Sequence, residues 1–158
     1  MSRRCVFLDR DGVINEKAEP HHYVRTWNEF RFLPNIADWI RIFNALDYLV
    51  IAITNQRGIA RGIMTQESVD EIHRRMLDAL AAVGARIDDV LVCPHEENVC
   101  DCRKPKPGLV FQAQAKWDID IGHSLMIGDS GDDAKLAAVC GIRFLRADGR
   151  GRLEPGSC

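Results

Sequence analysis

Short, continuous apolar runs alternate along this chain with longer amphipathic segments, and this alternation constrains the fold more than any other feature. The runs do not alternate in polarity, as residues 5–8 and 49–53 illustrate. Strands of that kind are typical of a parallel sheet whose two faces are both covered. Further runs at residues 90–92, 125–127 and 142–145 complete the expected strands. The sequence therefore predicts an α/β fold, in which a Rossmann-like parallel sheet carries helices on both faces.

The segments between these runs have the apolar spacing of amphipathic helices. Helices are expected between residues 36–43, 65–83, 107–117 and 130–140. Thr65 and Ser130 are the expected N-caps, because their side-chain oxygens can accept N–H groups of the first turn. Gly84 and Gly141 are expected to end two of the helices, since glycine readily adopts the left-handed conformation found there. Pro34 is expected at an early position of the first helix.

Length and charge narrow the classes of protein that this chain can be. Its 158 residues suit a single domain over 1–158, and the composition of residues 148–158 predicts a loose C-terminal tail. A formal net charge of −2 argues against a general nucleic-acid binder. No apolar run approaches the roughly 18 residues of a membrane span, and the first run is too short for a signal peptide. We therefore expect a cytoplasmic monomer that binds neither nucleic acid nor membranes.

Two aspartates that follow the first strand are the strongest functional signal. Asp9 and Asp11 can point to the same side of the chain, and two close carboxylates repel each other unless a cation is present. Asp129 and Asp133 follow the fourth strand, and parallel strands bring their carboxyl ends to one edge of the sheet. An all-oxygen site of this kind suits Mg²⁺. Turn chemistry or a helix N-terminus would explain either segment alone, but explains the two together less well.

These segments resemble the motifs of the haloacid dehalogenase superfamily of phosphohydrolases. The four motifs match Asp-x-Asp-Gly at residues 9–12, Thr54, Lys104, and Gly-Asp-x-x-x-Asp at residues 128–133. The resemblance implies that Asp9 attacks phosphorus and forms an aspartyl-phosphate. It implies that Asp11 protonates the leaving alkoxide and then activates water.

The resemblance also assigns the groups that bind the phosphoryl oxygens. Thr54 and Lys104 would hold these oxygens, and Mg²⁺ would neutralise charge in the transition state. The implied magnesium ligands are Asp9, Asp11 and Asp129. The role of Asp133 stays open, although its four-residue spacing from Asp129 favours it over Asp132. A solvated surface lysine is the simpler alternative for Lys104.

Four residues with zinc-ligand chemistry lie within ten positions of one another. They are Cys93, His95, Cys100 and Cys102. Zinc accepts a tetrahedral set of three thiolates and one imidazole, and four filled positions make a structural site. A polar loop of this length cannot bury a core of its own, so a metal would order it. Disulfides are the alternative, which a reducing compartment disfavours. Cys5 and Cys140 lie in apolar runs and are expected as core thiols, while Cys158 ends the tail.

The cysteine–histidine pattern resembles one subgroup of the superfamily, the heptose-bisphosphate and histidinol-phosphate phosphatases. The resemblance implies a haloacid dehalogenase fold without a large cap domain and a zinc-stapled loop that delivers Arg103 and Lys104. Residues 54–62 look more like the heptose branch, whereas the short spacer at residues 96–99 is also typical of the histidinol-phosphate branch. The expected substrate contacts are Tyr23, Asn55, Gln56, Arg57 and Arg103.

The resemblance thus implies a hydrolase of carbohydrate metabolism. The expected reaction is Mg²⁺-dependent removal of the 7-phosphate from D-glycero-D-manno-heptose 1,7-bisphosphate, a step toward the heptose of lipopolysaccharide. A histidinol-phosphate phosphatase of histidine biosynthesis is the alternative with the same chemistry. A non-catalytic, zinc-stapled binding module is the alternative from another class, and the intact motif residues argue against it.

Overall fold

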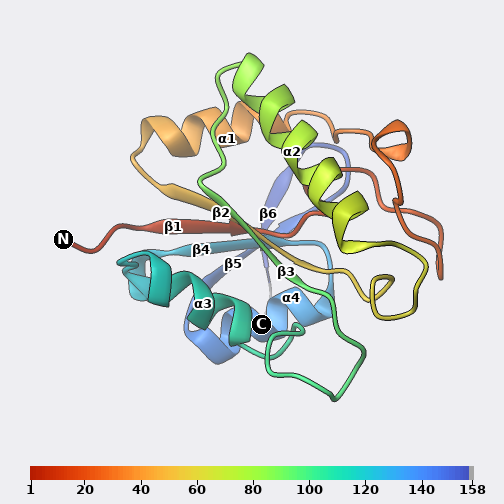
Figure 1. Ribbon diagram of the computed structural model, residues 1–158. Coiled ribbons are helices and arrows are strands. Elements are labelled where there is room, and N and C mark those ends of the chain that lie inside the picture. The colour runs from red at the N-terminus through yellow and green to blue at the C-terminus, as the bar shows by residue number, and fades with distance from the viewer. Residues whose placement is uncertain (157–158) are drawn as a thin grey trace.

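A six-stranded sheet lies at the centre of the protein, with two helices on each of its faces (Figure 1). The computed structural model describes residues 1–156. The strands are β1 (Cys5–Leu8), β2 (Leu49–Asn55), β3 (Asp89–Cys93), β4 (Leu125–Gly128), β5 (Arg143–Ala147) and β6 (Leu153–Pro155). The helices are α1 (Ile36–Ala45), α2 (Gln66–Ala82), α3 (Gly108–Lys116) and α4 (Gly131–Cys140), with short 3₁₀ turns η1 (Trp27–Glu29) and η2 (Ile121–His123).

The strand order is β3-β2-β1-β4-β5-β6, and every neighbouring pair is parallel except β5 and β6. Alternate residues of β1 face two separate hydrophobic clusters. Val6 and Leu8 belong to the cluster with α1 and α2, whereas Cys5 and Phe7 belong to the cluster with α3 and α4. All four side chains are fully buried, which explains why the strand is apolar at every position. The predicted α/β fold with helices on both faces is confirmed, and Cys5 is a core thiol as expected.

The register of the central strands brings the polar residues together. Leu8 pairs with Ala52 of β2 and with Ile127 of β4, so these strands end at the same edge of the sheet. The loops that follow lie on the side of the molecule away from the N-terminus (Figure 1). The longest connection within residues 1–156 is the one between β1 and α1, and it carries only η1. Cover for this edge of the sheet therefore comes from loops.

Most helix ends follow the expected chemistry. The side chain of Thr65 accepts a hydrogen bond from the Ser68 backbone N–H, and Ser130 accepts one from the Asp133 N–H. Gly141 has a φ of 69°, in the left-handed region that glycine tolerates. The expectation for Pro34 is wrong, because Asn35 is the N-cap and α1 begins at Ile36. The first residue with helical geometry therefore lies beyond the proline.

The C-terminal segment differs from the loose tail that was expected. Residues Leu153–Pro155 form β6, which pairs antiparallel with β5, and the Trp39 indole N–H donates to the Gly151 carbonyl at 3.1 Å. Leu153 packs against the core cluster of α1 and α2. Pairing with β5 satisfies backbone groups that a sheet edge would otherwise expose. The expectation for Cys158 lies outside the described residues. Within the part of the chain that the structure describes, no helix is long and apolar enough to cross a membrane.

Candidate active site

A cavity of about 320 Å³ opens at the edge of the sheet where β1, β2 and β4 end. Asp9, Lys104 and Asp129 form part of its wall, and residues 17–24 of the β1–α1 loop border it. Asp9 and Lys104 are buried, as is Thr54 at the end of β2. Crevices at the carboxyl ends of parallel strands are the usual ligand sites of open α/β sheets. The cavity is therefore the candidate active site.

Lys104 lies between two buried carboxylates in this cavity. Its Nζ donates to Asp9 Oδ1 at 2.9 Å, to Asp133 Oδ1 at 2.8 Å and to the Ile53 carbonyl at 3.1 Å. Burial alone would lower the pKa of Lys104, but Asp9 and Asp133 outweigh it and hold the pKa above its ordinary value. Lys104 is thus a fixed cation, and the alternative of a solvated surface lysine is wrong.

Asp9 is a carboxyl whose ionisation needs support from its surroundings. Burial raises the pKa of Asp9 to about 8, and the neighbouring Asp133 and Asp11 add to this effect while Lys104 opposes it. The Arg10 backbone N–H donates to the same Oδ1 that Lys104 contacts, at 2.9 Å. A divalent cation beside the other oxygen would favour the ionised form further.

Three carboxylates are placed to hold such a cation. Asp9, Asp129 and Asp133 each offer an oxygen, and these atoms lie within 4.8 Å of one another. Asp129 Oδ1 is buried with no hydrogen-bond partner within residues 1–156, while Asp129 Oδ2 accepts from Lys17 Nζ at 2.9 Å. An all-carboxylate set with an unpaired oxygen fits Mg²⁺, a hard cation. The side chain of Asp11, expected as a magnesium ligand, is not part of this group, whereas that of Asp133 is.

Donors hold both oxygens of Asp11. Oδ1 accepts from Arg10 Nη2 at 2.8 Å and from Asn15 Nδ2 at 2.9 Å. Oδ2 accepts from Gln56 Nε2 at 2.9 Å. Burial acts to raise the pKa of Asp11, but Arg10 and these hydrogen bonds hold it below its ordinary value. Since Asp11 also lines the cavity, it is a fixed carboxylate that can exchange a proton with a bound ligand.

The residues at the end of β2 form hydrogen bonds that connect Thr54, Asp11 and the segment that carries Lys104. Thr54 Oγ1 accepts a hydrogen bond from Gln56 Nε2 at 2.9 Å, so Gln56 links Thr54 to Asp11. Asn55 Nδ2 donates to the Lys104 carbonyl at 3.2 Å, and Asn55 Oδ1 accepts from the Lys104 backbone N–H at 3.0 Å. Asn55 lines the cavity, and this double contact fixes the segment that carries Lys104.

Among the residues expected to contact substrate, Tyr23, Asn55 and Arg103 line the cavity, whereas Gln56 and Arg57 do not. Arg57 Nη1 instead donates to Glu96 at 3.2 Å and to Glu97 at 2.8 Å. These contacts tie the loop after β2 to the loop after β3. Arg103 has a buried Nη1 that finds no hydrogen-bond partner in the described part of the chain. Arg103 therefore offers donors to an anion in the cavity.

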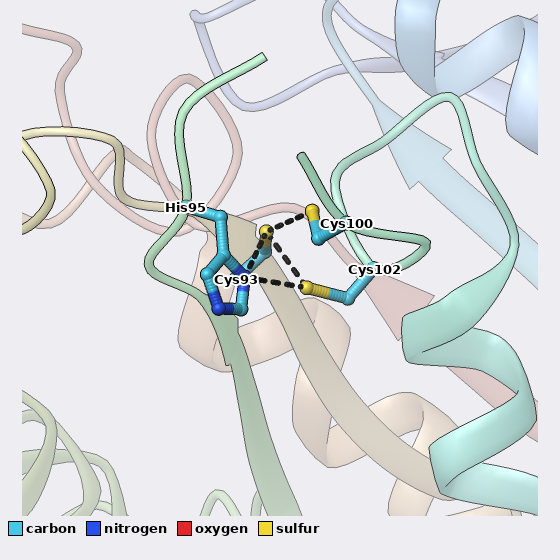
Figure 2. A group of neighbouring side chains, drawn as sticks. All are labelled: Cys93, His95, Cys100 and Cys102. Carbon is cyan, nitrogen blue, oxygen red and sulfur yellow. Dashed lines mark hydrogen bonds between the residues drawn. The ribbon is translucent and has the colours of Figure 1, made fainter. Parts of the chain in front are cut away.

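The cysteines and the histidine predicted to bind zinc come together beside this site. Figure 2 shows the four side chains of Cys93, His95, Cys100 and Cys102 converging from the end of β3 and the loop before α3. Cys93 Sγ lies 2.8 Å from Cys102 Sγ and 3.6 Å from Cys100 Sγ. His95 Nδ1 lies 3.2 Å from Cys102 Sγ. All four could hold one metal ion, and no disulfide joins the cysteines.

The backbone of this loop is packed closely against α3. A Cβ atom on Gly108 would lie 2.3 Å from the Asp101 carbonyl oxygen, so only glycine fits there. Lys106 Nζ donates to the Cys100 carbonyl at 2.9 Å. Burial acts to raise the pKa of the Cys100 thiol, but the backbone N–H groups of Arg103 and Cys102 help lower it to about 7. The loop thus favours a thiolate at Cys100, the form that binds metals.

The family model described as polynucleotide kinase 3 phosphatase matches residues 4–146 of the chain. The chain belongs to the polynucleotide kinase 3 phosphatase family. It is 44% identical over 155 residues to the D-glycero-beta-D-manno-heptose-1,7-bisphosphate 7-phosphatase of Rhodopseudomonas palustris, covering 93% of this chain and 84% of that protein. It is 41% identical over 135 residues to the D-glycero-alpha-D-manno-heptose-1,7-bisphosphate 7-phosphatase of Mycobacterium tuberculosis, covering 84% and 70%.

Solved structures agree with this membership. A D,D-heptose 1,7-bisphosphate phosphatase from B. bronchiseptica, complexed with magnesium and phosphate, superposes with a TM-score of 0.83 at 34% identity. The match covers 89% of this chain and 78% of that chain. A haloacid dehalogenase superfamily hydrolase from Geobacter sulfurreducens, at 14% identity and a TM-score of 0.58, shares the fold. The expected haloacid dehalogenase fold is thus confirmed for this member of the polynucleotide kinase 3 phosphatase family.

The sequence did not predict the burial of two polar side chains beside the candidate active site. Arg10 separates Asp9 from Asp11, and nothing in the motif shows that its side chain is fully buried. His73 follows Val69 by four positions and precedes Met76 by three, so it lies on the apolar stripe of α2. That spacing was a readable signal of burial. The Arg10–His73 contact itself joins residues 63 positions apart and has no signal in the sequence.

Gly12→Ala is expected to weaken Mg²⁺ binding. A Cβ on Gly12 would come within 2.1 Å of Asp129 Oδ2, and Gly12 has a φ of +93°, which alanine rarely adopts. The substitution should lower the free energy of unfolding by about 1–3 kcal/mol. Isothermal titration with Mg²⁺ and thermal unfolding measure the two effects. Gly122→Ala is the matched control, because its Cβ would meet only Asp120 Oδ1 at 3.7 Å. Unchanged Mg²⁺ affinity in a folded Gly12→Ala protein would contradict the placement of the metal at Asp129.

Proposed function

We propose that this protein is a Mg²⁺-dependent phosphatase that removes the 7-phosphate of D-glycero-D-manno-heptose 1,7-bisphosphate. The observation that carries the proposal is the buried Asp9–Lys104–Asp133 contact beside a cavity with a second carboxyl, Asp11, at its wall. This arrangement supplies a nucleophile, a phosphate-binding cation and a proton-transfer group at one place. The 44% identity to a phosphatase of this name supports the choice of substrate.

In the proposed reaction, Asp9 acts first as the nucleophile. Its carboxylate oxygen forms a bond to phosphorus while the bond from phosphorus to the C7 oxygen breaks, and Asp11 gives its proton to that oxygen. Water then attacks the phosphorus of the aspartyl-phosphate and Asp11 takes a proton of this water, while the bond from phosphorus to the Asp9 oxygen breaks and inorganic phosphate leaves. The low pKa of Asp11 favours the base that the second step needs. An anionic phosphoryl group beside Asp11 raises the pKa of Asp11, which favours the protonated form that the first step needs.

Positive charge around the phosphoryl group comes from the chain and from a metal. Lys104 is placed to contact phosphoryl oxygens next to Asp9, and Thr54 lies in the same part of the site. Asp9, Asp129 and Asp133 would hold Mg²⁺, which neutralises charge on the transferred group.

We infer that the metal at the cysteine–histidine cluster is zinc. The donor set of three sulfurs and one imidazole nitrogen is the one that structural zinc sites use. Zinc there would order the loop that carries Arg103 and Lys104 to the cavity. Unpaired cysteines persist most readily in a reducing compartment, which supports a cytoplasmic location.

A substrate comparison tests the proposed function. Phosphate release with Mg²⁺ is measured for both anomers of the heptose 1,7-bisphosphate, for histidinol phosphate and for a 3′-phosphorylated oligonucleotide. We expect the largest kcat/KM for a heptose bisphosphate. Both anomers are included because one relative of this chain is named for the beta anomer and another for the alpha anomer. A larger kcat/KM for histidinol phosphate would show that the proposed substrate is wrong. A larger kcat/KM for the oligonucleotide would show that the proposed class of substrate is wrong.

A further inference from the structure

Arg10 carries a buried charge between the two aspartates of the first motif. Its Nη2 donates to Asp11 Oδ1 at 2.8 Å, and its Nη1 lies 3.1 Å from His73 Nε2. The ring of Phe30 lies 6.0 Å from the guanidinium carbon. A buried guanidinium is costly unless its charge and N–H groups have partners. Asp11 and His73 supply partners for Nη2 and Nη1, and the ring of Phe30 faces the charge.

His73 is the acceptor in its contact with Arg10. A guanidinium has only donors, so His73 Nε2 must carry the lone pair and the ring proton must lie on Nδ1. Burial, reinforced by the nearby Arg10 charge, lowers the pKa of His73 to about 4, which keeps the ring neutral near pH 7. His73 belongs to α2, and the neighbouring Ile72 and Met76 pack into the core. The acceptor is therefore held by a rigid element.

The planar shape of the guanidinium links His73 to Asp11. Because the fork is rigid, contacts at Nη1 and Nη2 together set its orientation. Arg10 Nε has no hydrogen-bond partner among the described residues. Without the acceptor at His73, the guanidinium can turn, and the donor that orients Asp11 Oδ1 turns with it.

The geometry points to His73 as a positioning residue that, through Arg10, holds the Asp11 carboxyl in the orientation for proton transfer to the leaving oxygen. This inference rests on the proposed function, which gives Asp11 that task, and extends it to a helix outside the four motifs. A purely structural role for His73 would change stability and would affect all substrates alike. A positioning role instead affects most the substrates whose leaving group needs a proton.

Two variants of His73 separate these roles. In His73→Gln the amide oxygen reaches about as far as Nε2 and keeps an acceptor for Arg10, whereas in His73→Asn the shorter side chain does not reach. The substrates are the heptose 1,7-bisphosphate, whose alkoxide needs a proton, and p-nitrophenyl phosphate, whose p-nitrophenolate leaves without one. The kcat/KM values report steps up to the aspartyl-phosphate, so the later attack of water does not enter the comparison.

We expect His73→Asn to lower kcat/KM for the sugar by about tenfold or more relative to p-nitrophenyl phosphate. His73→Gln should restore the ratio of the two values to about that of the unmodified protein. If His73→Asn does not fold, as judged by circular dichroism, His73→Leu serves as the acceptor-free variant. The same ratio in the acceptor-free variant as in the unmodified protein overturns the positioning role.

Asp11→Asn shows whether a failure concerns the inference or the proposed function. It should show the selective loss on the sugar substrate, because it lacks the proton donor itself. If Asp11→Asn leaves the ratio unchanged, the assignment of Asp11 fails and the positioning role fails with it. If Asp11→Asn shows the selective loss but His73→Asn does not, only the positioning role is overturned.

Discussion

Asp9→Asn is expected to abolish phosphate release while the protein stays folded. The amide has nearly the shape of the carboxyl, but it lacks both the nucleophilic oxygen and the negative charge that faces Lys104 and the metal site. Loss of a nucleophile lowers kcat by about 10³-fold or more. The measurements are Mg²⁺-dependent release of phosphate and the covalent label left on acid-quenched protein after brief exposure to radiolabelled substrate.

The same exchange at an exposed site is the control for Asp9→Asn. Asp78→Asn on α2 removes a carboxylate whose side chain is 72% exposed and whose nearest ion-pair partner, Arg74, is 3.4 Å away. It should keep full turnover and full covalent labelling. The assignment of Asp9 is wrong if Asp9→Asn still forms a covalent phosphoryl-protein that breaks down in Mg²⁺.

Cys102→Ser is expected to remove the bound zinc and most of the activity. Cys102 lies close to two other members of the cluster, Cys93 and His95, and immediately precedes Arg103 and Lys104. Without the metal, the polar loop loses the group that orders it, and Lys104 loses its fixed approach to Asp9. Misplacement of such a group by about 1 Å costs on the order of 10²-fold in rate. Elemental analysis gives the zinc content, and phosphate release gives the activity.

Cys140→Ser is the control for this substitution, because that cysteine is half-buried on α4 and lies outside the cluster. It should retain both zinc and activity. A zinc-free Cys102→Ser protein with full activity would show that the loop holds Lys104 without metal. The proposal that zinc orders this loop for activity would then be wrong.

Much of the fold was predictable because its elements are local. The strand at residues 5–8 is apolar at each position, and both of its faces are buried in the structure. The capping hydrogen bond of Thr65 comes from the backbone N–H of Ser68, only three residues away. The segment that became β6 has no such local signal, since Leu153–Pro155 pairs with β5 and Leu153 packs against the core cluster of α1 and α2. A strand formed only through distant partners is not visible in composition.

The site divides in the same way between local and distant contacts. Motif spacing placed Asp9 and Asp129 at one edge of the sheet, and the structure brings both to the cavity. Spacing did not reveal that Asp11 would be held by Gln56, nor that Arg57 would pair with Glu96 and leave the cavity. These contacts depend on how loops fold back over the sheet.

The sequence by itself determined which chemical groups exist and which edge of the sheet they reach, because strand polarity and short-range spacing are properties of neighbouring residues. Only the tertiary structure decided how those groups are charged and oriented. Lys104 is a buried cation because it meets Asp9 and Asp133, which lie 95 and 29 positions away. Asp11 is oriented by Arg10, which reaches His73 across 63 positions. Burial and Coulomb interactions act through space, so the charge and orientation of each of these groups are properties of the folded chain.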